Sequence, residues 1–406
     1  MAVNLDPATN LLPVAGVRLG AASAAIKREG RDDLLIIEVV AGTTAAAVFT
    51  QSSFRAAPVQ IAARHLNIVS PRALVINSGN ANAATGEPGK DDALACSAAV
   101  AAALGVRVEE VLPFSTGVIG VRLPVERMVA AAPRAAAALT ADAWDAAART
   151  IMTTDTVPKA RSRRVQLGAD SAVITGMCKG AGMMKPDMAT MLAFVATDAA
   201  VDASLLRRMV LSVADKSFNR VTIDGDTSTN DSFVVLATGA NGAGSIHSEN
   251  DPRYPLLLSA LCDLCGELAQ AIARDGEGAT RFVTVEVNGG RTQEEARRVA
   301  FTIAESPLVK TAMFAGDANW GRFCMAIGRA GVVDLDTNGV SLFLDNVCVA
   351  KHGMISPEYS EDAGAAVMAR AEYVVRVELG RGGASETVWT SDFSYDYVKI
   401  NAEYRT

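Results

Sequence analysis

The chain has 406 residues, of which half are hydrophobic and a fifth are charged, and its net charge is −7. This length supports a large core or two closely associated units, and the acidic balance disfavours non-specific binding to nucleic acid, which requires a basic surface. The N-terminal residues lack the basic and apolar regions of a secretory signal, and no uninterrupted apolar run is long enough to span a bilayer, so we expect a cytoplasmic protein without a membrane or nucleic-acid partner.

Strand-like and helix-like segments alternate through the first half of the chain. Runs of apolar and β-branched residues bounded by turn residues predict strands at 34–40, 45–50, 73–79, 163–168 and 171–178. Apolar residues spaced three and four apart predict helices at 91–105, 124–139 and 144–153.

The second half opens on a Gly-rich stretch, 179–189, that leads directly into a strand-like run, 190–201. Asp202 is a suitable N-cap for the helix that follows. Apolar patterns predict helices at 202–219, 252–276 and 292–314, and strands at 232–239, 281–289, 340–346, 372–380 and 386–400, so that the last ninety residues are mainly β. Because many connections resemble hairpins, we expect an α/β (α+β) fold in which mixed or antiparallel sheets are layered with helices.

Cysteine and histidine usage gives little indication of a metal site. Six cysteines in a chain of this length do not form a disulfide framework. Cys262 and Cys265 form a CxxC, but their flanks are typical of a helix, and no second CxxC or nearby histidine completes a zinc site. The three histidines, at 65, 247 and 352, are dispersed. We therefore expect neither a bound metal nor a resident cofactor.

The junction between Ala189 and Thr190 has the pattern of a self-cleaving N-terminal nucleophile. A flexible Gly-rich loop feeds into a strand, and a small residue precedes a hydroxyl residue. Cleavage would give Thr190 a free α-amino group with a pKa of about 7.7–8.0, able to act as the base for its own hydroxyl. Two other interpretations fit the local pattern, namely a Gly-rich hairpin and a phosphate loop, although the GxxxxGK[ST] spacing is missing.

Longer motifs extend over essentially the full length of the chain, and with them it resembles the ornithine acetyltransferase family, also called glutamate N-acetyltransferase, of the N-terminal-nucleophile type. The motifs are VINSGNANAATG (75–86), PFSTGVIG (113–120), MTTDTVPK (152–159), KGAGMMKPDMATML (179–192), FNRVTIDGDTSTNDS (218–232), GEGATRFV (276–283), GDANWGR (316–322) and YVKINAEYRT (397–406).

The resemblance implies an activity and an organisation. Such proteins cleave themselves before the Thr of the ATML motif, here giving an α chain (1–189) and a β chain (190–406) that form one interwoven catalytic unit. Thr190 then takes acetyl from N2-acetylornithine and passes it to glutamate by a ping-pong mechanism in arginine biosynthesis. Some members also accept acetyl-CoA as a co-substrate. The resemblance further implies assembly of the cleaved chains as α2β2 or larger.

The resemblance also implies site residues. Thr116 and Gly117 correspond to the oxyanion hole, whose donors must be aimed at the developing charge. The substrate-binding positions correspond to Thr153, Lys179, Thr190, Glu277, Asn401 and Thr406, with Thr154 as an alternative to its neighbour. The polar cluster of Asp224, Asp226, Asn230 and Asp231 lacks EF-hand spacing, and we interpret it as structural turns in preference to an ion site.

Two other functions remain open from the sequence. A self-processing aminopeptidase or amidohydrolase would use the same nucleophile, with water in place of glutamate. An uncleaved homologue could instead keep the fold and bind a small molecule without catalysis.

Overall fold

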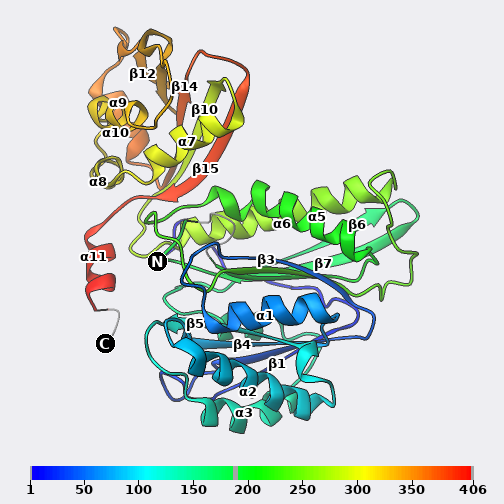
Figure 1. Cartoon of the computed structure of the whole chain (residues 1–406). Coiled ribbons are helices and arrows are strands. Elements are labelled where there is room, and N and C mark those ends of the chain that lie inside the picture. The colour runs from blue at the N-terminus through cyan, green and yellow to red at the C-terminus, as the bar shows by residue number, and fades with distance from the viewer. Residues whose placement is uncertain (1, 186–190, 404–406) are drawn as a thin grey trace.

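The computed structural model describes residues 2–185 and 191–403. Ala189, Thr190 and Thr406, which carry the predicted cleavage point, the nucleophile and one substrate contact, lie outside the described residues. The described chain forms three β-sheets with helices on their faces (Figure 1). This arrangement confirms the expected α/β (α+β) fold with mixed sheets.

The first two sheets pack face to face. The first has the order β1-β2-β4-β5 and contains β1 (Val17–Ala22), β2 (Leu34–Val39), β4 (Ala73–Asn80) and β5 (Val111–Val118). The second has the order β3-β9-β8-β7-β6 and contains β3 (Thr44–Phe49), β9 (Ser232–Ala237), β8 (Leu192–Thr197), β7 (Asp170–Lys179) and β6 (Lys159–Leu167). Their facing side chains form one apolar cluster, in which the rings of Phe114 and Phe194 meet edge to face at 5.1 Å.

Helices cover the outer faces of this pair of sheets. The first half contributes α1 (Ala57–Ile68), α2 (Gly86–Leu104), α3 (Val125–Ala137) and α4 (Trp144–Thr150), of which α2 and α3 cover the first sheet. Helices α5 (Ala203–Lys216) and α6 (Arg253–Arg274) cover the second sheet. By length and composition α6 could cross a membrane, but 56% of its most apolar window is buried, because leucines at 257, 261, 264 and 268 form a stripe against the sheet.

The third sheet belongs to a separate lobe at one end of the molecule (Figure 1). Its order is β13-β12-β11-β14-β10-β15, with β13 (Met354–Ile355), β12 (Val347–Lys351), β11 (Ser341–Leu344), β14 (Glu372–Glu378), β10 (Phe282–Gly290) and β15 (Ala384–Ser391). Its helices are α7 (Gln293–Ala304), α8 (Pro307–Ala315), α9 (Trp320–Gly328) and α10 (Glu361–Met368). From β15 the chain runs back toward the first two sheets and ends in α11 (Tyr395–Ala402).

Several details differ from the sequence-based predictions, which placed no element at β1, α1 or β5. The predicted helix at 292–314 is two helices, because Ser306 caps a new helix that begins at Pro307. The predicted strand at 386–400 ends at Ser391, and α11 follows it, while α9 and α10 add helix to a part of the chain predicted to be mainly β. Asp202 stands at the N-cap position of α5, but its carboxylate bonds to Ser245 and His247 and does not cap the helix.

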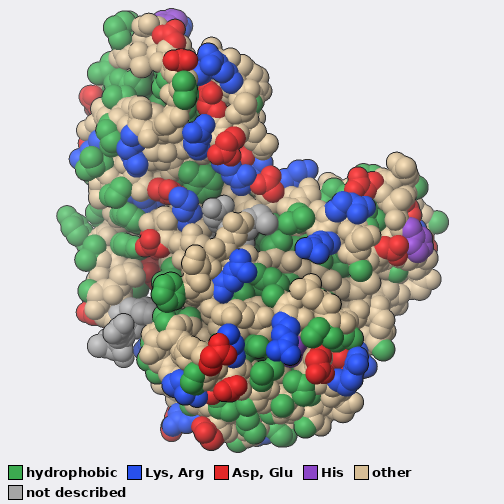
Figure 2. Space-filling model, in the orientation of Figure 1, with side chains coloured by type: hydrophobic (Ala, Val, Ile, Leu, Met, Phe, Trp, Pro, Cys, Tyr) green, Lys and Arg blue, Asp and Glu red, His purple; other side chains and the backbone are tan. Residues whose placement is uncertain are grey.

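The surface carries both signs of charge. On the face drawn in Figure 2, acidic and basic side chains are interspersed over the lobe and over the body. This distribution agrees with the small negative net charge and with the absence of long like-charge runs in the sequence.

Candidate active site

The predicted oxyanion residues lie at the end of β5, beside the end of β4. The two strands are parallel, Gly79 is in register with Gly117, and the register shifts at Asn80. Gly117 has φ +133°, and a Cβ built on it would lie 2.2 Å from the backbone carbon of Gly79. Only glycine can therefore occupy position 117, because any side chain would collide with the neighbouring strand. We call the ends of the two strands, with Gly79, Thr116 and Gly117, the oxyanion corner.

Lys179, from the second sheet, contacts the same corner. It is the last residue of β7, and its Nζ donates to Oγ1 of Thr116 at 3.3 Å. Both residues line a small cavity of about 30 Å³ together with Met191, which follows Thr190 in the sequence. The structure thus brings a hydroxyl, a glycine corner and an ammonium group together beside the start of β8.

Asp231 is a residue of this cavity whose role the sequence did not indicate. It is 2% exposed, and its Oδ2 has no hydrogen-bond partner among the described residues. Burial raises the pKa of Asp231 well above its usual value, despite a hydrogen bond from Ser228 and the nearby charge of Lys179. Its neighbour Asn230 donates to the backbone oxygens of Ala81 and Ser115, which ties the start of β9 to the oxyanion corner.

We expect Asp231→Asn to remove part of the pH dependence of stability. The folded protein holds the Asp231 proton more tightly than the unfolded chain, whose aspartates titrate near a pKa of about 3.9. The contribution of Asp231 to the free energy of unfolding is therefore fully present below the unfolded pKa. It is lost as the pH rises from there through the pKa of Asp231 in the folded protein. As the pH rises above about 4, the Tm of the wild type should fall more than the Tm of the variant.

The matched control for this experiment is Asp142→Asn, which changes an exposed aspartate. Its Tm should follow that of the wild type across the same pH range. Parallel Tm curves for Asp231→Asn and the wild type would contradict the prediction.

A buried ion network supports the loop that leads to the predicted cleavage point. Lys159 is buried, and its Nζ lies 2.7 Å from Asp155 and 2.5 Å from Asp275. Burial opposes ionisation of Asp155, but the charges of Lys159 and Lys179 outweigh it and hold the Asp155 pKa below its usual range. The Asp155 carboxylate accepts from the backbone N–H of Thr153 at 3.0 Å and of Gly180 at 2.8 Å. One charged group thus fixes two parts of the predicted site.

Glu277 and Asn401 lie together beside the same loop. The Nδ2 of Asn401 donates to Oε2 of Glu277 at 2.9 Å, and the backbone N–H of Glu277 donates to the oxygen of Ala181. A Cβ on Gly182 would lie 2.4 Å from Oε2 of Glu277, so the loop passes directly over the carboxylate. Glu277 lines a cavity of about 580 Å³ whose wall also contains Asp275, Asp396 and Glu403, with Lys399 as its one cation among the described residues.

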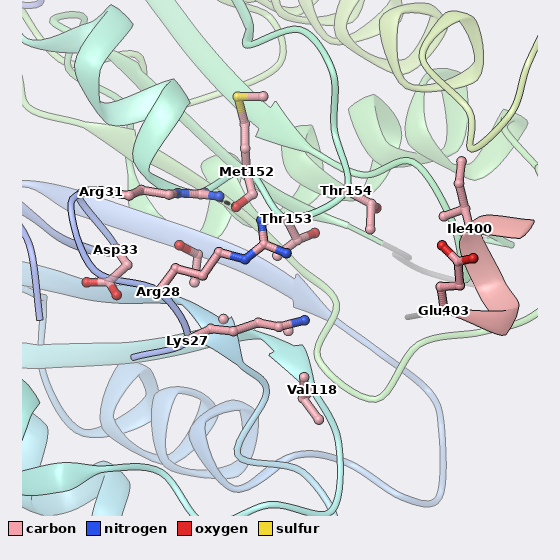
Figure 3. A pocket seen from close by; sticks show the side chains of 13 residues that line it. Lys27, Arg28, Arg31, Asp33, Val118, Met152, Thr153, Thr154, Ile400 and Glu403 are labelled. Carbon is pink, nitrogen blue, oxygen red and sulfur yellow. Dashed lines mark hydrogen bonds between the residues drawn. The ribbon is translucent and has the colours of Figure 1, made fainter. Parts of the chain in front are cut away.

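A second large cavity, of about 320 Å³, shares Thr154, Ile400 and Glu403 with the first. Gly117 and Thr153 line it, and Thr154 lines both this cavity and the acidic one. Figure 3 shows Lys27 and Arg28 extending toward Thr153 and Val118, with Ile400 of α11 and Glu403, the residue after that helix, across the space. Because each threonine lines the cavity, the geometry leaves the choice between Thr153 and Thr154 open.

The polar cluster after η2 (Phe218–Arg220), a short 3-10 helix, supports the loop through its first aspartate. The Asp224 carboxylate accepts the backbone N–H groups of Met183 and Met184 at 2.6 and 2.7 Å. Within residues 2–185 and 191–403, no group of three His, Cys, Asp or Glu side chains is placed to hold a metal ion.

Sequence reasoning named some of these residues and missed others. The structure brings together Thr116 with Lys179, and Glu277 with Asn401. The missed residues are Lys27, Arg28, Asp155 and Lys159, while Asp231 was named only as part of a cluster of structural turns. Asp155 and Lys159 stand inside the MTTDTVPK motif, so their opposite charges were visible in the sequence, but the segment is not helical and their spacing did not indicate that they pair.

Comparison with known proteins gives consistent matches. A sequence model of the ArgJ family matches residues 18–406. The chain is 51% identical to the arginine biosynthesis bifunctional protein ArgJ of Pseudomonas fluorescens and 53% identical to that of Neisseria meningitidis, in each case over 100% of both chains. A solved structure of the ArgJ protein of Bacillus halodurans is 38% identical, covers 52% of this chain and 97% of its own, and superposes with a TM-score of 0.49.

Proposed function

The chain belongs to the ArgJ family, and from this premise we propose that it transfers an acetyl group from N2-acetylornithine to glutamate through an ester on Thr190. Two relatives that match over their full length are named as arginine biosynthesis bifunctional proteins, which supports a role in that pathway. The observation that carries the proposal is the contact of Lys179 with Thr116, beside the Gly117 corner and Met191.

Self-cleavage prepares the nucleophile in this proposal. The Thr190 hydroxyl attacks the Ala189 carbonyl carbon, the peptide C–N bond breaks as an ester forms, and water hydrolyses the ester to leave the Ala189 carboxylate and a free Thr190 amine. Anchoring of the chain around this point supports the step. Gly180, Met183 and Met184 are held by the Asp155 and Asp224 carboxylates, and Met191 leads into the buried strand β8.

Transfer then takes two steps on the same residue. The Thr190 amine accepts the hydroxyl proton as the oxygen attacks the acetyl carbonyl of acetylornithine, and the C–N bond breaks as ornithine leaves with that proton. The neutral amine of glutamate next attacks the ester, the Thr190 oxygen leaves as the C–O bond breaks, and the proton lost by the attacking nitrogen passes through the Thr190 amine to that oxygen. Each step passes through an oxyanion, which the Gly117 N–H and the Thr116 hydroxyl would stabilise, with the Lys179 charge close by.

The charges around the corner suit the donor substrate. Ornithine carries a δ-ammonium group, and the Glu277 carboxylate, 7% exposed and oriented by Asn401, is a fitting partner for it. Thr153 and Lys179 are proposed to contact the rest of the substrate, and Thr406 remains a proposal from the sequence alone. We also propose that the cleaved chains associate as α2β2 or a larger assembly.

The principal alternative is hydrolysis, because water could replace glutamate in the second step. Incubating the protein with acetylornithine, with and without glutamate, distinguishes the two. Formation of acetylglutamate in step with ornithine is the expected result. Release of acetate at a rate that does not depend on glutamate would overturn the proposal. Replacing acetylornithine by acetyl-CoA in the same assay tests the second candidate donor, which the resemblance suggests.

A further inference from the structure

Three cations line the same cavity as Gly117. Lys27, Arg28 and Arg31 all come from the loop between β1 and β2, and all line this cavity. The protein as a whole is acidic, with a net charge of −7, so a local group of three cations is not a consequence of composition.

The loop that carries them is held in place by buried contacts. The Asp33 carboxylate, 4% exposed, accepts the backbone N–H groups of Ala24 and Ile26, each at 2.6 Å. Arg31 donates to the backbone oxygen of Met152, which precedes Thr153. The negative charge of Asp33 is therefore used inside the loop, while Lys27 and Arg28 extend into the cavity (Figure 3).

This loop packs directly on the oxyanion corner. A Cβ on Gly79 would lie 3.2 Å from the Cβ of Lys27, and Gly79 is in register with Gly117. Lys27 thus lies one strand away from the glycine proposed to stabilise the oxyanion. A substrate whose anionic group binds Lys27 or Arg28 could therefore place its reacting atom at the oxyanion corner.

The two large cavities share Thr154, Ile400 and Glu403, and they differ in the balance of charge in their walls. The cavity of Glu277 is acidic, with Asp275, Asp396 and Glu403 in its wall, and the cavity of Lys27 has three cations and two carboxylates. The proposed reaction uses one substrate with a cationic side chain and one with an anionic side chain. A single site lined by Glu277 would repel the second of these, because like charges at close range are unfavourable.

We propose that Lys27 and Arg28 bind the side-chain carboxylate of the acyl acceptor, so that the acceptor reaches the acetyl ester from the basic cavity. The inference rests on the proposed function, and it assigns acceptor specificity to two residues outside the positions implied by the resemblance. Charge-assisted hydrogen bonds from an ammonium and a guanidinium group favour a carboxylate over the neutral amide of the same shape.

The test compares glutamate with glutamine as acceptor, using the purified full chain. With saturating acetylornithine, we expect Lys27→Met combined with Arg28→Gln to lower kcat/KM for glutamate about tenfold or more, because charged hydrogen bonds are lost. The value for glutamine should change little. The rate at which the acetyl-enzyme forms in the absence of acceptor, measured as the increase in mass of the β chain, should be unchanged.

Arg207→Gln is the matched control, since Arg207 is exposed on α5 and lines neither cavity. An unchanged preference for glutamate over glutamine, or an equal loss for both acceptors, would overturn the inference. A loss of activity seen only with acetyl-CoA as donor would also overturn it, because the cavity lined by Lys27 and Arg28 would then bind the phosphate groups of that donor. Failure of the wild type to form an acetyl-enzyme would instead overturn the proposed function, and this inference with it.

Discussion

Replacing Thr190 with Ala should leave the chain as a single species of 42.3 kDa and reduce acetyl transfer to background. The proposed cleavage and both transfer steps use the same hydroxyl, so one change removes all three. The measurement is intact mass under denaturing conditions, together with the assay of acetylglutamate formation. The expected wild-type result is two fragments whose masses add to the full chain plus one water.

Thr190→Ser is the matched variant, because it keeps the hydroxyl and removes one methyl group. It should cleave and transfer acetyl more slowly than the wild type. A wild-type protein that stays intact after long incubation and is inactive would contradict the nucleophile assignment and favour a non-catalytic binding protein. An active Thr190→Ala variant would contradict it as well.

Replacing Gly117 with Ala should lower kcat by about 10²–10³, the range expected when an oxyanion donor is lost. The added Cβ would lie 2.2 Å from the backbone carbon of Gly79 and 2.5 Å from the backbone nitrogen of Asn80, and φ is +133°. The strand end must shift to relieve this collision, and the backbone N–H moves with it. Initial rates at saturating acetylornithine and glutamate measure the effect.

Gly120→Ala provides the control three residues away. Gly120 also has a positive φ, +81°, but no heavy atom lies within 4 Å of a Cβ at that position. It should therefore cost about 1–2 kcal/mol of stability from backbone strain and leave kcat nearly unchanged. Equal losses of activity in the two variants would show that general strain, and not the oxyanion corner, is responsible.

The fold could be predicted from the sequence wherever a local pattern was strong. The buried strands β2, β4 and β9 have continuous apolar runs, and their predicted bounds agree with the structure within one or two residues. The strand predicted at 386–400 is correct to Ser391, and its last part was wrong because YDYVKI alternates polar and apolar residues as a strand does. The helix there depends on Ser394, whose Oγ accepts from the backbone N–H of Asp396.

The site was less predictable, because its contacts join distant segments. Lys179 and Thr116 are 63 residues apart, and Asn401 and Glu277 are 124 residues apart. The resemblance to a family identified these residues as site positions, but the local sequence around each of them did not indicate which residues contact each other. The sequence analysis interpreted Asp231 as part of a turn. Burial raises the pKa of its carboxyl, and burial cannot be seen in the sequence because it arises only when the chain folds. Lys27 and Arg28 belong to a charged loop that the sequence alone does not distinguish from a solvated surface.

The second sheet takes its strands from both sides of residue 190. Strands β8 and β9 follow that residue, and in the order β3-β9-β8-β7-β6 they lie between strands that precede it. The proposed cut therefore yields two chains that share one sheet, and neither can leave without exposing the core. Folding, a unimolecular equilibrium in the intact chain, becomes an association of two molecules. The thermal midpoint of the cleaved protein should then rise more steeply with protein concentration than that of Thr190→Ala, because unfolding of the cleaved protein separates more chains.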